Sequence, residues 1–183
     1  MTWNAFHRRG DVLRAVVDAA DSRRDAALPM DVPGVTEHFR DELDLLAALL
    51  LRWHARLSGA IERELMLEPL DLEAAVARAW RRTCEDMPGV RLVIDRCVAE
   101  PTDAAMETAL ERARQREWIR LAQAAGLAND ESRAAALAGR RLEDRARALE
   151  LESSLAEAMP APAAADTPET ATLVQRIRAV LAA

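Results

Sequence analysis

Residues 39–60 read FRDELDLLAALLLRWHARLSGA, and their apolar side chains recur at alternating steps of four and three. These steps place one set of side chains on a single helical face, namely Phe39, Leu43, Leu46, Leu50, Trp53, Leu57 and Ala60. Leu45, Leu49 and Leu51 add apolar side chains on the other sides, and a helix that is apolar all round is enclosed by neighbours. We therefore predict a long helix over residues 35–66, at the centre of a helical bundle.

Composition supports the same fold class along the whole chain. The 183 residues include 39 Ala and 24 Leu, against two Phe, four Trp and no Tyr. Ala and Leu favour helices, whereas the β-branched and aromatic residues that strands favour are scarce. We expect an all-α protein, a bundle of about six helices around the long central helix.

Periodicity and capping residues place the other helices. Residues 24–34 contain two prolines and a glycine, which predicts a loop. Residues 90–98 have strand-like composition, but they also form a helical face and have no partner strand, so we predict a short helix. The remaining helices are predicted within residues 3–23, 71–87, 101–125 and 129–150.

The chain divides into three predicted parts. Residues 1–158 form the helical bundle domain, and residues 159–167 (MPAPAAADT) form a Pro/Ala linker. Residues 168–183 form a C-terminal amphipathic helix whose apolar face, the predicted partner-binding surface, consists of Leu173, Val174, Ile177, Val180 and Leu181. So short a helix is marginal alone in water, so its face needs a groove on its own domain, on a second copy or on another protein.

Charge and cysteine use indicate the compartment. The formal net charge is −6, and no apolar run approaches the length of about 20 residues that crosses a membrane. Cys84 and Cys97 do not form a disulfide scaffold or a CxxC motif, and the first residues lack a signal-peptide pattern. We expect a cytoplasmic protein without membrane contact. The 25 basic residues are all Arg, which is typical of a GC-rich bacterial genome and excludes lysine chemistry.

The residues that usually carry metal or catalytic chemistry form no motif. His38 and His54 lie on one predicted helix, roughly 24 Å apart, and His7 is far from both in sequence. His38 with Asp41 and Glu42 is interpreted as a solvated polar face, and His54 as a hydrogen-bonded residue at the edge of the core. Cys84 and Cys97 fall on apolar faces, where thiols behave as small hydrophobes. We therefore predict no cofactor, metal or catalytic residue and lean against an enzyme.

Two features on the helix from residue 101 bear on anion binding. Arg112, Arg116 and Arg120 repeat at four-residue steps, which stacks three guanidinium groups on one face. That face either binds phosphates or an acidic partner, or pairs with carboxylates of neighbouring helices. Residues 121–127 resemble the first half of a helix-turn-helix, but the acidic residues 130–131 stand where a recognition helix would begin, so an ordinary helical hairpin is favoured.

Three functions remain open from the sequence. The first is a non-enzymatic adaptor or regulator that acts through protein–protein contacts or self-association of helical surfaces, including the tail helix. The second is a helical DNA-binding transcriptional regulator that uses residues 118–141 and the arginine ladder. The third is a bundle that binds a small molecule or a metal near the central helix.

Overall fold

The structure of the protein is a computed structural model, and it describes residues 3–158. Every regular element in that range is a helix, which confirms the all-α prediction. The helices are α1 (Trp3–Arg23), α2 (Val35–His38), α3 (Glu42–Leu67), α4 (Leu72–Asp86), α5 (Pro88–Ala99), α6 (Ala104–Ala124) and α7 (Arg133–Ala158). The chain divides into two units, Met1–Glu150 and Leu151–Ala183, and the described part of the second is the end of α7. The predicted linker (159–167) and tail helix (168–183) lie outside the described residues.

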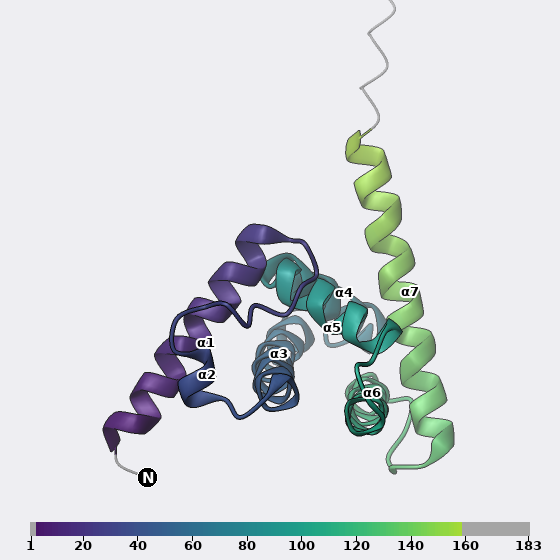
Figure 1. The fold of residues 1–183 in the computed structure, drawn as a ribbon. Coiled ribbons are helices and arrows are strands. Elements are labelled where there is room, and N and C mark those ends of the chain that lie inside the picture. The colour runs from purple at the N-terminus through teal and green to yellow at the C-terminus, as the bar shows by residue number, and fades with distance from the viewer. Residues whose placement is uncertain (1–2, 159–183) are drawn as a thin grey trace, which may run out of the picture. The chain divides into compact units, whose positions relative to one another are not determined.

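The helix that packs most extensively against the others in the first unit is α3. This helix packs against α1, α4, α5 and α6, and α1 packs in turn along α5 (Figure 1). The short helix predicted over residues 90–98 is present as α5. None of the described helices combines the length and the hydropathy of a bilayer-crossing segment.

The prediction of a single helix over residues 35–66 is wrong at its beginning, because the helix is interrupted there. α2 ends at His38, Phe39 is extended with φ −123° and ψ 133°, and α3 begins only at Glu42. The carboxylate of Asp41 accepts a hydrogen bond from the backbone N–H of Asp44 at 2.8 Å and so caps α3. The break keeps Phe39 in the core, with 2% of its surface exposed.

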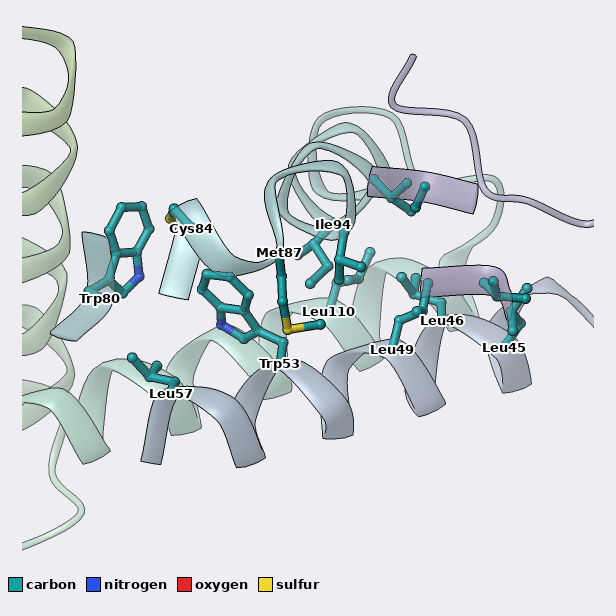
Figure 2. Packing of buried hydrophobic residues seen from close by; sticks show 14 of the residues in the cluster. Leu45, Leu46, Leu49, Trp53, Leu57, Trp80, Cys84, Met87, Ile94 and Leu110 are labelled. Carbon is teal, nitrogen blue, oxygen red and sulfur yellow. The ribbon is translucent and has the colours of Figure 1, made fainter. Parts of the chain in front are cut away.

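Side chains on one side of α3 form the middle of the core. Figure 2 shows those of α3, which are Leu45, Leu46, Leu49, Trp53 and Leu57. Trp53 meets Trp80 of α4 edge to face, with ring centroids 6.2 Å apart and ring planes inclined by 75°. Such an aromatic pair contributes about 1 kcal/mol beyond the area that it buries.

One side of α3 is not covered, although the sequence predicted apolar neighbours all round. Leu51 is 71% exposed, and Leu50 is only half-buried. The neighbouring helices cover the sides that carry Leu46, Leu49 and Trp53, and they leave the side of Leu51 open.

The start of α5 lies so close to α1 that only glycine fits between them. A Cβ atom at Gly89 would lie 1.9 Å from the carbonyl oxygen of Ala20. The carboxylate of Asp21 in α1 accepts hydrogen bonds from the backbone N–H groups of Gly89 and Val90, at 2.8 and 3.3 Å. A side chain of one helix thus caps another helix, which fixes the position of α5 on α1.

The connection from α6 to α7 follows its capping residues. Gly126 has φ +70°, and the N–H of Leu127 donates to the carbonyl of Ala122 at 2.9 Å, as in a Schellman motif. α6 therefore ends within one residue of the predicted limit at residue 125. The start of α7 was predicted too early, because the hydroxyl of Ser132 makes the cap by accepting from the N–H of Ala135 at 3.2 Å.

The close approach at Gly89 gives a prediction with a matched control. Gly89→Ala forces its new methyl group against a backbone carbonyl, so we expect the free energy of unfolding to fall by about 3 kcal/mol. Gly59→Ala, inside α3 with no atom nearer than 3.9 Å to the added Cβ, is expected to raise it by up to about 1 kcal/mol. Urea denaturation of both variants measures the difference. Equal effects would show that α1 and α5 are not in such close contact.

Candidate functional site

Glu117 is a buried carboxylate in the middle of α6. Its side chain is 7% exposed, and its Oε2 accepts hydrogen bonds from Nε1 of Trp53 at 3.1 Å and Nε2 of His54 at 2.9 Å. Because an ionised carboxylate only accepts, the hydrogen in the second bond belongs to Nε2 of His54. Two adjacent residues of α3 therefore hold one oxygen of α6, and the prediction of His54 as a hydrogen-bonded residue at the core edge is confirmed.

The other oxygen of Glu117 lies nearest to a buried arginine of α5. Nη1 of Arg91 is 3.8 Å from Oε1 of Glu117, which is an ion pair but too long for a hydrogen bond. The guanidinium carbon of Arg91 lies 5.0 Å from the ring centroid of Trp53 and 5.7 Å from that of Trp80. These are cation–π distances, so Arg91 brings α3, α4, α5 and α6 together at one point.

Burial and pairing act in opposite directions on this ion pair. Burial raises the pKa of Glu117. The hydrogen bond from His54 and the charge of Arg91 lower this pKa by more than burial raises it, so the pKa lies below its ordinary value. Burial lowers the pKa of Arg91, but the hydrogen bond to Asp95 together with the negative charges of Asp95 and Glu117 outweighs burial, so the pKa is raised. Both groups are therefore charged at neutral pH.

Charged contacts continue from Arg91 to α7. Asp95 accepts hydrogen bonds from Arg91 and from both terminal nitrogens of Arg147, the latter at 3.1 and 2.9 Å. Arg147 also donates to Glu143 at 2.9 Å, and Glu143 accepts the indole N–H of Trp118 at 2.5 Å. The polar network therefore runs through the first unit from α3 to α7.

Glu117 was missed at the level of the sequence, although a signal for it is present. The apolar face of α6 contains Met106, Leu110, Ala113, Leu121 and Ala124. Position 117 is the missing member of that helical series. A charge at a core position needs a buried partner, but the sequence does not say which. Trp53, one partner, is 64 residues away.

A groove between α3 and α6 opens beside Glu117. Its volume is about 320 Å³, which lies within the range of small-ligand sites. Most of its wall is apolar and consists of Leu43, Leu46, Ala47, Leu50, Leu51, Ala109, Leu110 and Ala113. On each helix the polar lining residues come after the apolar ones, and they are His54 of α3 and Arg116, Glu117 and Arg120 of α6. The groove therefore has an apolar body and a charged end.

Two of the three arginines of the predicted anion-binding face line this groove. Arg116 and Arg120 belong to its wall, whereas Arg112, one turn earlier on α6, does not. Arg116 and Arg120 are exposed, and neither pairs with a carboxylate among residues 8–149. Guanidinium groups without such partners are available to an anion from solution.

The helix-turn-helix resemblance does not extend to the geometry of α6 and α7. The segment between them covers residues 125–132, whereas that motif uses a turn of about three or four residues. Asp130 accepts from the N–H of Ser132 at 3.2 Å, so this acidic residue shapes the turn. The two helices also meet at Trp118 of α6, because Arg114 of α6 and Arg140 of α7 lie over its ring, at 4.8 and 5.7 Å from the ring centroid.

The remaining candidate residues are not brought together. Asp41, grouped with His38 in the sequence, caps α3 instead. Cys84 is buried, and burial followed by the charge of Glu42 raises the pKa of the Cys97 thiol, which keeps it protonated. In the part of the chain that the structure describes, no three His, Cys, Asp or Glu side chains are arranged to hold a metal ion. The side chain of His7 and the tail residues 173–181 lie outside the described part.

A second surface lies where α3 turns into α4, and we call Met66, Leu67, Leu70 and Leu72 the α3–α4 corner. Met66 is 84% exposed, Leu67 73% and Leu70 100%, while Leu72 is partly covered. Periodicity did not distinguish these residues, because the apolar pattern of α3 simply continues into the turn. Four large apolar side chains in seven positions form an exposed apolar patch.

The buried carboxylate gives a prediction about acid stability. Glu117→Gln keeps the shape but removes the charge, so we expect a loss of about 1.5–3 kcal/mol in the free energy of unfolding at pH 7. Glu111→Gln, exposed on the same helix, is expected to change it by less than about 0.5 kcal/mol.

The pH dependence follows from the lowered pKa of Glu117. The stability that its ionised form adds is complete above the unfolded pKa near 4.5 and is lost as the pH falls through the lower folded pKa. Urea denaturation from pH 7 to pH 3 is expected to show the wild type and Glu117→Gln converging in acid. A difference that stays constant or grows in acid would contradict the buried ion pair.

Comparison of the chain with protein-family models, with curated proteins and with solved structures returns no match.

Proposed function

We propose that this protein is a non-enzymatic adaptor or regulator that binds a protein partner through its helical surface. The observation that carries the proposal is the α3–α4 corner, where Leu70 is fully exposed beside Met66 and Leu67. Burying one such side chain contributes about 1.5–3 kcal/mol, so leaving several in water at one turn is costly unless a partner covers them. Apolar patches of this kind mark protein interfaces.

The charge around the corner specifies the kind of partner. The five carboxylates of residues 62–73 lie at positions 62, 64, 68, 71 and 73, and those at positions 64, 68 and 73 pair with Arg78 or Arg145. The other two, Glu62 and Asp71, are exposed, and no arginine pairs with either of them among residues 8–149. An apolar protrusion with an acidic rim fits an apolar groove whose rim is basic, because complementary charges steer the encounter and fix the register. We therefore propose a protein partner that presents such a groove.

The tail is a second contact element in this proposal. Its predicted apolar face, Leu173, Val174, Ile177, Val180 and Leu181, belongs to a helix too short to be stable alone. Binding of that helix in a groove of the same partner would add to the affinity of the corner through the short linker.

Photo-crosslinking tests the corner. A photoreactive residue is placed at position 70, and as a control at position 137, where Leu137 is 46% exposed on α7. After irradiation in the host cell, position 70 is expected to give one abundant adduct whose crosslinked peptide lies in an apolar groove flanked by Arg or Lys. Leu67→Asp in the same chain is expected to reduce that adduct at least tenfold, because a carboxylate would be buried in the interface.

Several results would contradict the proposal. These are equal crosslinking at positions 70 and 137, an adduct that Leu67→Asp leaves unchanged, or an adduct only with a second copy of this chain or with lipid. A chain ending at residue 158, with the circular dichroism of the full chain, tests the tail separately. Its adduct is expected to weaken, and unchanged capture would remove the tail from the proposal.

A further inference from the structure

The α3–α6 groove differs from the α3–α4 corner in shape and charge, so it calls for a different ligand. The corner is a protruding turn with carboxylates around it, whereas the groove is a hollow of about 320 Å³ with arginines at one end. Its lining runs from Leu43 to His54 along α3 and from Ala109 to Arg120 along α6. Eleven steps of about 1.5 Å give it a length of roughly 16 Å, so it is long and narrow.

The wall of the groove is apolar over most of this length. Four leucines of α3 and one of α6 contribute, and the alanines at positions 47, 109 and 113 keep the space between the helices open. Leu51 is 71% exposed, so water covers apolar surface here that a ligand would shield. A slender hydrocarbon body matches such a slot, because each buried methylene adds to the binding free energy.

The charged end of the groove favours an anion. The carboxylate of Glu117 is already held by His54 and Trp53, and its charge is balanced by Arg91. Arg116 and Arg120 are left without a carboxylate partner among residues 8–149. They lie one helical turn apart on the same wall, so two guanidinium groups can donate to one carboxylate.

We propose that the α3–α6 groove binds a small monocarboxylate with a medium-length alkyl chain. The alkyl chain lies along the leucines of α3, and the carboxylate accepts hydrogen bonds from Arg116 and Arg120. Glu117 is a positioning residue in this site, because its bonds to α3 hold α6 at the width of the groove.

Calorimetric titration of the full chain with octanoate, decanoate and decanol tests the proposal. One decanoate is expected per chain, bound about tenfold more tightly than octanoate, since two added methylenes each contribute about threefold. Decanol, which has the chain but no charge, is expected to bind at least tenfold more weakly than decanoate. Decanoate is expected to change the amide NMR chemical shifts of residues 43–54 and 109–120.

Matched arginine variants locate the carboxylate. Arg116→Gln combined with Arg120→Gln is expected to weaken decanoate binding at least tenfold. Arg112→Gln, the same change one turn outside the groove, is expected to leave it within twofold. All three positions are exposed, so these substitutions leave the fold intact.

The proposal is overturned if decanoate does not bind, if decanol binds equally well, or if Arg112→Gln weakens binding as much as the double variant. Binding of an acidic amphipathic peptide in the groove, without binding of decanoate, would overturn it too and would assign the groove to a protein. None of these results bears on crosslinking at position 70, so this proposal and the α3–α4 corner fail independently.

Discussion

The arrangement of the helices depends on one buried carboxylate and the groups that surround it. Glu117 of α6 is held by Trp53 and His54 of α3 and lies 3.8 Å from Arg91 of α5. Removing this carboxylate costs about 1.5–3 kcal/mol, because buried donors lose a charged acceptor, although Arg91 keeps its bond to Asp95. Such a network contributes less to net stability than an apolar core of equal volume would. Its consequence is geometric, since Trp53 and His54 reach the same oxygen of Glu117 only when α6 lies alongside α3.

This placement connects the core to the surface. The side of α6 that carries Glu117 faces α3, and the flanking residues Arg116 and Arg120 are thereby set at the edge of the same groove. At the far end of α3 the apolar pattern continues past the end of the core, which leaves Leu67 and Leu70 in water. Both surfaces thus arise from α3, which extends beyond what its neighbours cover. Helical proteins often use such uncovered faces for recognition.

The sequence predicted the ends of helices well where a capping residue sets them. Asp71 and Asp103 cap α4 and α6 by accepting from the N–H groups of Ala74 and Met106, and Gly126 ends α6 as expected. The break at Phe39 was missed, because an apolar residue fits a helical stripe whether its backbone is helical or extended. The exposure of Leu51 was missed for a related reason: periodicity shows which side chains are apolar but not which neighbours cover them.

The site was less predictable than the fold, because its partners are distant in sequence. His54 and the arginine ladder were visible as single features, but whether they line one groove with Glu117 depends on how α3 and α6 pack. The claim that Glu117 joins these helices is tested most directly by a double-mutant cycle of His54→Ala and Glu117→Gln, measured as the free energy of unfolding. Direct contact predicts a coupling energy of about 1–3 kcal/mol, whereas effects that add within about 0.5 kcal/mol would contradict it.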